Sequence, residues 1–171
     1  MKKEILIMGI DQGYANLGIA ILGYQPETKN ISIKETKTIQ TYPTDEMSVR
    51  LKKIYNEVKQ ITKEYKIKYA ACERLFHNKT QSNGRNKSAN IMYTNMSTGV
   101  IYLICGQKNI QMKDYAPTSV KKTLTNNGRA TKEELEIALN ELMNKFGIEV
   151  HSNHESDAIA IAITLIEREL K

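Results

Sequence analysis

The stretch that decides the fold runs from Ile5 to Leu22 and reads ILIMGIDQGYANLGIAIL. Its first apolar run, Ile5 to Ile10, is short and continuous, which is typical of a strand buried on both faces. The four residues Asp11-Gln12-Gly13-Tyr14 then turn the chain, and a second apolar run begins at Leu17. Because the connection is so short, we expect the two strands to pair antiparallel, with Asp11 at the end of the first.

Strand-like patterns recur three more times along the chain. They lie at residues 31–39, 69–72 and 110–115, and Glu73 directly follows the second of them. β-Branched alternation marks the first of these runs, and the others are short apolar runs. We therefore expect five strands, of which the first three form a meander.

Segments with the spacing of amphipathic helices lie between the later strands. Apolar side chains recur every three or four residues in 46–66, which indicates an amphipathic helix, and another helix is expected at 88–107. A polar, basic stretch at 77–88 is typical of a loop. Further helices are expected from Pro117, after the capping box Thr131-Lys132-Glu133-Glu134, and after the second box Ser152-Asn153-His154-Glu155. The pattern predicts an α/β fold with a mixed five-stranded sheet and helices on both faces, as a single domain over residues 1–171.

The amino-acid composition of the chain limits the classes of function that it can have. The chain has 171 residues and a net charge of +6, which suits a polyanionic partner without distinguishing DNA from RNA or an acidic membrane. Its two cysteines, Cys72 and Cys105, lie in apolar stretches, so we expect reduced core residues rather than a disulfide or a zinc site. No apolar run is long enough for a membrane span or a signal peptide, so we expect a soluble, cytoplasmic protein.

Three acidic residues lie where ligand sites form in open α/β sheets. Asp11 and Glu73 directly follow strands, and Asp157 lies near the start of the last helix. Carboxylates brought close together repel one another, and a divalent cation relieves that repulsion. Hard oxygen ligands suit Mg²⁺ or Mn²⁺. His154 precedes Asp157 by three residues and shares its helix face, so it is a further metal-ligand or water-activating candidate, with Glu155 as its rival.

Each acidic residue also has a structural alternative. Asp11 can be a turn residue, Glu73 can pair with Arg74, and Asp157 is favoured near a helix start by the macrodipole alone. His154 can simply lie in an exposed first turn. Glu155 fits the capping box so well that its structural interpretation is the better one. The functional interpretation depends on the whole set lying at one edge of the sheet.

Several cations lie in segments next to the proposed carboxylates. A positive surround would hold a phosphate backbone beside a metal site. These candidates for DNA binding are Arg74, Lys79, Arg85, Lys87, Lys121 and Lys132. Phe76, three residues after Glu73, is either a core residue or a stacking surface for an unpaired base.

Four segments resemble the RuvC family of Holliday-junction resolvases. They are residues 7–13, residues 71–76, residues 115–121 and Ser156-Asp157-Ala158-Ile159-Ala160-Ile161-Ala162. Their order and spacing span nearly the whole chain, and the last is the most specific. The chain is similar to the RuvC-like proteins of lactococcal bacteriophages, which would place it in the host cytoplasm if it is encoded by a phage.

The resemblance implies an RNase H-like fold, a homodimer, two Mg²⁺ or Mn²⁺ ions per active site and no small-molecule cofactor. It implies nicking of four-way and other branched DNA that leaves 5′ phosphates. It places Asp11, Glu73 and Asp157 in the catalytic set, and the fourth family position falls on His154, where many members have Asp and some have His. Lys121, Lys132 and Phe76 match family positions near the DNA, and residues 88–107 match the family's dimer helix.

Three other functions remain open at the level of sequence. The chain could bind branched DNA without cutting it, or it could be an RNase H-like nuclease that acts on structured RNA. An actin-like ATPase shares the Asp11-Gln12-Gly13 pattern, but that fold needs two such domains and this chain has the length of one.

Overall fold

A five-stranded sheet forms the centre of the protein, which is described here from a computed structural model covering residues 3–74, 85–146 and 152–171. The strands are β1 (Ile5–Asp11), β2 (Asn16–Gln25), β3 (Asn30–Gln40), β4 (Ile67–Glu73) and β5 (Gln111–Tyr115), in the order β3-β2-β1-β4-β5. The first three strands form an antiparallel meander, and β4 and β5 run parallel to β1. The sheet is therefore mixed, as predicted.

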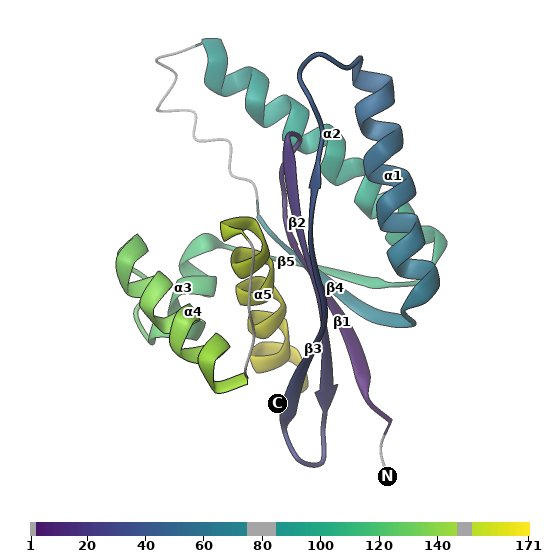
Figure 1. Cartoon of the computed structure of the whole chain (residues 1–171). Helices are drawn as coiled ribbons and strands as arrows, with labels where there is room; N and C mark the ends of the chain where they lie inside the picture. The colour runs from purple at the N-terminus through teal and green to yellow at the C-terminus, as the bar shows by residue number, and fades with distance from the viewer. Residues whose placement is uncertain (1–2, 75–84, 147–151) are drawn as a thin grey trace.

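Helices cover both faces of the sheet (Figure 1). One face carries α1 (Met47–Glu64) and α2 (Arg85–Gln107), and the other carries α3 (Pro117–Thr125), α4 (Lys132–Phe146), α5 (Asn153–Leu165) and the short π-helix η1 (Ile166–Leu170). The two predicted capping boxes differ. In the first, Thr131 N–H donates to Glu134 and Glu134 N–H donates to Thr131; in the second, Ser152 accepts from Glu155 N–H.

Side chains that alternate between the two faces of the sheet form two separate hydrophobic cores. Ile7, Leu22 and Ala71 pack against α5, whereas Met8, Ile10 and Ile19 face α1 and α2. The continuous apolar run of β1 follows from this arrangement, because each face of the strand meets a layer of helices. Cys72 and Cys105 are buried free thiols in the second core. No described helix combines the length and the apolar character that a membrane-spanning segment requires.

The start of α2 differs from the prediction. The helix begins at Arg85, so it includes the last residues of the stretch that the sequence assigned to a loop. On this helix Ile101, Ile104 and Cys105 face the core, whereas Leu103 is exposed. The remaining part of the predicted loop, residues 77–84, lies outside the described residues.

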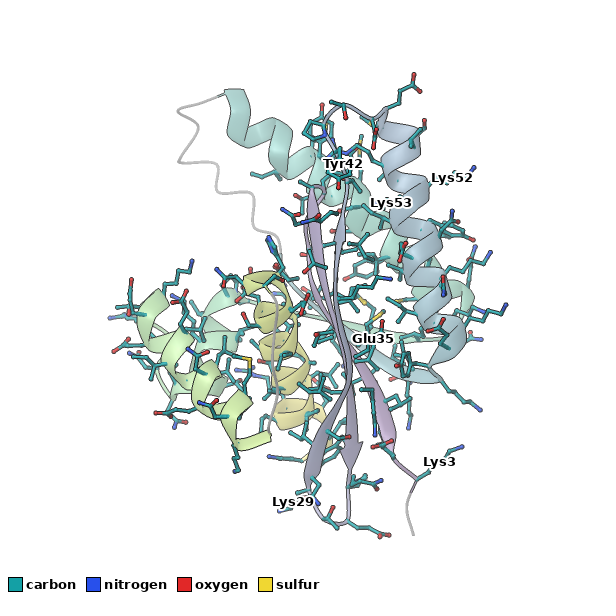
Figure 2. The ribbon with its side chains drawn as sticks, in the orientation of Figure 1. Lys3, Lys29, Glu35, Tyr42, Lys52 and Lys53 are labelled. Atoms are coloured by element: carbon teal, nitrogen blue, oxygen red, sulfur yellow. The ribbon has the colours of Figure 1, made fainter. Side chains whose placement is uncertain are left out.

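The two ends of the sheet carry different residues and different strand ends. Lys3 and Lys29 lie at one end, and Tyr42, in the connection from β3 to α1, lies at the other (Figure 2). Strands β1 and β4 both run toward the end that carries Tyr42, and α5 begins there. The predicted acidic residues therefore belong to this end of the molecule.

Candidate active site

The parallel pairing of β1 and β4 brings Asp11 and Glu73 to the same edge of the sheet. Ile10 pairs with Cys72 in this register, so the next residue on each strand is acidic. Both strands reach this edge from the buried centre of the sheet, and both carboxylates are partly buried. Sequence reasoning placed these two residues correctly, because each directly follows an apolar run.

Two glycines let α5 lie close enough to add its side chains to this edge. A Cβ at Gly9 would lie 1.9 Å from the carbonyl oxygen of Ala158, and one at Gly18 would lie 2.0 Å from that of His154. Any larger residue would therefore push the helix away from the sheet. Close packing of α5 on β1 and β2 sets His154 and Asp157 above the ends of the strands.

The three acidic residues surround one pocket. Asp11, Glu73 and Asp157 line a cavity of about 200 Å³ together with Lys121 and Lys132. Pro117 and Val120 belong to its apolar wall. The structure thus brings together residues from β1, β4, α3, α4 and α5 that are up to 146 positions apart in the chain, from Asp11 to Asp157.

His154 is bonded to Asp11. The Nδ1 atom of His154 lies 2.6 Å from Oδ2 of Asp11, and with an ionised Asp11 the ring nitrogen is the donor. The side chain of His154 is 42% exposed and that of Asp11 is 23% exposed. Burial raises the pKa of Asp11 above its ordinary value, and the hydrogen bond and charge of His154 partly offset that rise. His154 therefore stabilises the ionised form of Asp11.

The other two carboxylates also resist ionisation. Burial, followed by the charges of Asp11 and Asp157, raises the pKa of Glu73, whereas Lys121 lowers it. Desolvation by surrounding protein, followed by the charge of Asp11, raises the pKa of Asp157 to about 6, although its side chain keeps an exposed surface. Mutual repulsion of this kind is expected where carboxylates gather without a neutralising cation.

The two lysines are positioned differently. Lys121 donates from Nζ to the carbonyl oxygen of Ala130 over 2.6 Å, which holds it at the pocket wall. Lys132 is 75% exposed and lies 3.6 Å from Glu136, a surface pair that constrains it little. Lys121 is thus fixed at the cavity, and Lys132 can move over it.

Two sequence alternatives are resolved by contacts. Glu155 is buried, and its carboxylate accepts hydrogen bonds from Thr36 and Thr38 of β3, so it points away from the acidic pocket. Arg74 pairs with Asp114 rather than with Glu73, and it does not line the pocket. Sequence reasoning had no signal for either partner, since both contacts join segments that are distant in the chain.

Four predicted DNA-binding residues cannot be placed. Phe76 and Lys79 lie outside the described residues. Arg85 and Lys87 belong to the first turn of α2, and their side chains are outside the described part of the structure.

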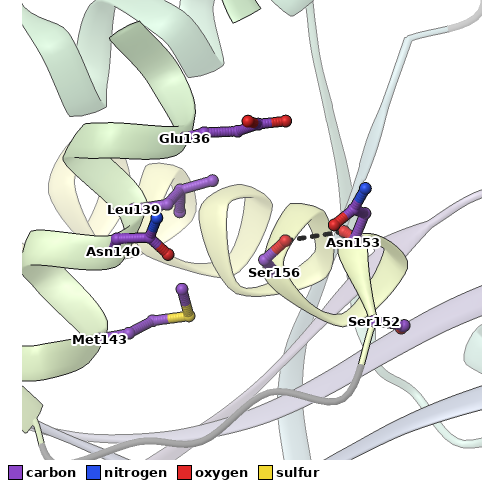
Figure 3. A pocket seen from close by; sticks show the side chains of 7 residues that line it. All are labelled: Glu136, Leu139, Asn140, Met143, Ser152, Asn153 and Ser156. Carbon is purple, nitrogen blue, oxygen red and sulfur yellow. Dashed lines mark hydrogen bonds between the residues drawn. The ribbon is translucent and has the colours of Figure 1, made fainter. Parts of the chain in front are cut away.

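Two further pockets lie near the acidic one. A cavity of about 340 Å³ between α4 and α5 is lined by Glu136, Asn140, Ser152 and other residues, none of which belongs to the predicted set (Figure 3). A third, of about 490 Å³, is lined among others by Tyr14, Arg50, Tyr93 and His154. Sequence reasoning missed the first three of these, because no motif links a tyrosine of the β1–β2 connection with an arginine of α1 and a tyrosine of α2.

The comparisons with known proteins agree with this architecture. The family described as crossover junction endodeoxyribonuclease RuvC matches residues 7–165. The protein of that name from Brachyspira hyodysenteriae is 32% identical over 167 residues, which cover 96% of this chain and 95% of the relative.

Solved structures show the same fold. Thermus thermophilus RuvC in complex with a Holliday junction substrate superposes with a TM-score of 0.79 at 20% identity, covering 94% of this chain and 92% of the other. The yeast mitochondrial Holliday junction resolvase gives a TM-score of 0.60 at 13% identity, covering 92% and 77%. The predicted RNase H-like fold is confirmed, and the chain belongs to the RuvC family of crossover junction endodeoxyribonucleases.

Proposed function

We propose that this protein is a metal-dependent endonuclease that nicks Holliday junctions and other branched DNA, using Asp11, Glu73, Asp157 and His154. The observation that carries the proposal is the single pocket in which three carboxylates from three elements lie beside two lysines. Family membership supplies the reaction class, since the relatives are named crossover junction endodeoxyribonucleases. The Thermus thermophilus relative was solved with a Holliday junction substrate.

The donor set supports Mg²⁺ or Mn²⁺, two per site. Carboxylate oxygens are the ligands that these hard cations prefer. The side-chain oxygen of Gln12, directly after Asp11, is buried and has no hydrogen-bond partner among the described residues, and it is another hard donor at this edge. No group of three His, Cys, Asp or Glu side chains in the described ranges already has the arrangement that a metal ion requires. Because a cation would relieve the repulsion that raises the pKa of Glu73, we expect metal loading to bring the carboxylates closer together.

The bound cations would polarise the scissile phosphate and lower the pKa of an attacking water, giving a 5′ phosphate and a 3′ hydroxyl. The chain's own residues supply the rest. Lys121, held by Ala130, contributes a fixed positive charge that attracts the phosphate backbone, and Lys132 adds a second at the same pocket. His154 keeps Asp11 ionised and oriented until the cations bind.

A homodimer would place two such sites on opposed strands of a junction. In support, α2 carries an exposed stripe, which we call the α2 stripe, made of Met92, Gly99, Tyr102, Leu103 and Gly106. Met92 and Leu103 are 47% and 57% exposed, and a Cβ at either glycine would meet nothing within 4 Å in the part of the chain that the structure describes. The distance between two packed helices depends on the side chains at their contact, so glycines flanked by apolar residues allow a second helix to approach closely.

Nicking of synthetic four-way junctions tests the proposal. With Mg²⁺ or Mn²⁺ we expect nicks near the crossover that ligase can seal, no nicks in EDTA, and little cutting of linear duplex or structured RNA. Asp11→Asn should retain junction binding and lose about a hundredfold or more in rate, because a ligand to the cations is weakened. Asp45→Asn, an exposed acid outside the pocket, is the matched control.

Two results would contradict the proposal. Normal cutting by Asp11→Asn would remove the acidic pocket from the reaction. Junction binding without any cutting under either metal would favour a protein that binds branched DNA only, and preferential cleavage of structured RNA would favour a ribonuclease.

A further inference from the structure

We infer that the cavity lined by Tyr14, Arg50, Tyr93 and His154, which we call the tyrosine pocket, binds a backbone phosphate of the DNA strand being cut, with Arg50 as its direct ligand. The inference rests on the proposed function, because it assigns the path of the substrate beyond the acidic pocket. It concerns residues outside the acidic set, and it makes separate predictions about affinity.

The tyrosine pocket adjoins the acidic pocket through one hydrogen bond. His154 lines the tyrosine pocket, Asp11 lines the acidic one, and the two side chains are joined over 2.6 Å. No residue is shared by the two linings. At about 490 Å³ the cavity falls within the range of nucleotide-sized ligand sites. A strand whose scissile phosphate lies at the carboxylates would reach this cavity with a neighbouring phosphate.

Arg50 is held in place before any ligand arrives. Its Nε donates to Thr41 Oγ1 over 2.9 Å, and its guanidinium carbon lies 3.7 Å from the centre of the Tyr14 ring. The Tyr14 ring in turn stacks on Tyr93, with centroids 5.1 Å apart and planes 15° apart. A side chain fixed in this way loses little rotamer entropy on binding, which favours affinity.

The charge of Arg50 is not neutralised by a neighbouring acid. The ion pairs found among residues 3–74, 85–146 and 152–171 do not include it. Asp45 and Glu46 precede its helix, but both are exposed and neither lines the cavity. Besides the Nε bond and the contact with the Tyr14 ring, the guanidinium makes one long hydrogen bond within the described residues, 3.5 Å from Nη2 to the carbonyl of Tyr14. Its outer edge can therefore donate to an anion.

The contacts of the rings favour a phosphate over a base as the ligand. The Tyr14 ring already contacts both Arg50 and Tyr93 and is 8% exposed, so it offers no open surface for a base to stack on. A guanidinium matches the geometry of phosphate oxygens through paired N–H donors. The two tyrosines thus serve to position Arg50.

Junction binding in EDTA, where no cutting occurs, tests this assignment. We expect Arg50→Gln to weaken the Kd about tenfold and to lower the slope of log Kd against log salt by about one. Lys52→Gln is the matched control, because Lys52 lies on the same helix, is exposed and extends away from the sheet (Figure 2). Its effect should stay within about twofold.

Methylphosphonate substitution locates the contact. Each phosphate near the cleavage point is neutralised in turn, and one position adjacent to the scissile phosphate should weaken binding by the wild-type protein but not by Arg50→Gln. The inference is overturned if, at every position, the loss of affinity caused by the methylphosphonate adds to the loss caused by Arg50→Gln. It is also overturned if a folded Arg50→Gln protein binds the junction with unchanged affinity.

A second measurement does not depend on the variant folding. Phenylglyoxal should modify Arg50 several times more slowly when the junction is bound, whereas Arg168, in the C-terminal segment, should react equally with and without DNA. Equal reactivity of Arg50 in both states would overturn the inference. If the wild-type protein binds no branched DNA, the proposed function fails, and this inference fails with it. If the protein binds and cuts junctions but Arg50 passes no test, only the inference fails.

Discussion

At the scale of single residues, the candidate site is a set of carboxylates that are costly to ionise together. Asp11, Glu73 and Asp157 all have raised pKa values, because burial removes solvent from each of them. Neighbouring negative charge raises the pKa of Glu73 and of Asp157 further. Folding therefore holds these groups in an unfavourable state at neutral pH, which a divalent cation would relieve. The stability of the protein should report on this arrangement independently of its activity.

The charge on Asp157 should destabilise the metal-free protein at neutral pH. Its pKa rises from an ordinary 3.8 to about 6 on folding, so the folded state binds more protons than the unfolded state between those values. Stability from this group is therefore fully present below pH 4 and is lost as the pH rises to 6.

Asp157→Asn removes that charge. In EDTA at pH 7 we expect its melting temperature to exceed that of the wild type by about 1–3 °C, with the difference vanishing near pH 4. Nicking should be lost. Thermal melts at both pH values check the prediction. A variant that is less stable than the wild type at pH 7 would show that the charge of Asp157 does not destabilise the folded protein.

His154 is the one member of the proposed site that is not a carboxylate. His154→Asp would replace a partner of Asp11 with a like charge, so we expect a lower melting temperature in EDTA at pH 7. The added carboxylate should also lower the Mg²⁺ concentration needed for half-maximal nicking. Asn153→Asp adds the same charge one residue earlier, where it lines the cavity between α4 and α5, and should do neither. An unchanged Mg²⁺ requirement in His154→Asp would place residue 154 outside the metal site.

At the scale of elements, the packing of α5 on the sheet decides whether the site exists. The helix carries His154 and Asp157, and it reaches Asp11 only because Gly9 and Gly18 have no side chains. The small residues Ala158 and Ala162 continue this contact along the helix, where both are fully buried. The geometry of the acidic pocket is therefore set by residues that take no part in its chemistry.

Gly9→Ala tests this dependence. The added methyl group would overlap the Ala158 carbonyl, so we expect a loss of about 1–3 kcal/mol in the free energy of unfolding and a strong loss of nicking. Asn56→Ala is the control, because Asn56 is an exposed residue in the middle of α1 and its replacement should change the free energy of unfolding by less than about 1 kcal/mol. Urea unfolding measures both. Equal stability of Gly9→Ala and wild type would show that α5 has room to move.

Sequence patterns predicted the elements better than their contacts. Apolar runs located the five strands, and apolar residues at helical spacing located the main helices. Asp11 and Glu73 were placed at one edge of the sheet because each directly follows an apolar strand. The close approach at Gly9, the bonds from Thr36 and Thr38 to Glu155, and the Arg74–Asp114 pair were not predicted. Periodicity reports which face of an element is buried, whereas these contacts depend on which distant element covers that face.

At the scale of the whole molecule, the proposed activity needs two copies of the site. One chain presents one acidic pocket, and a four-way junction requires paired nicks to be resolved. The exposed α2 stripe lies on the helix layer of the sheet opposite α5, so a second chain bound there would leave the acidic pocket uncovered. Dimer formation through α2 is thus compatible with DNA binding at the pocket.

Leu103→Glu should disrupt such a dimer. Leu103 is 57% exposed in the single chain, and a buried, unpaired carboxylate at a helix contact is strongly unfavourable. Light scattering should then report a monomer, and paired nicking of one junction should become two independent events. Ile137→Glu replaces an apolar residue of similar exposure, 59%, on α4 and should remain dimeric. A dimer that survives Leu103→Glu would place the interface elsewhere.

A Mn²⁺ titration of the protein without DNA, followed by electron paramagnetic resonance, tests directly whether the three carboxylates form one cation site. We expect saturable binding that weakens by about tenfold or more in each of Asp11→Asn, Glu73→Gln and Asp157→Asn, while Asp45→Asn binds as the wild type does. Equal Mn²⁺ affinity in all five proteins would contradict the claim that these three carboxylates form one cation site.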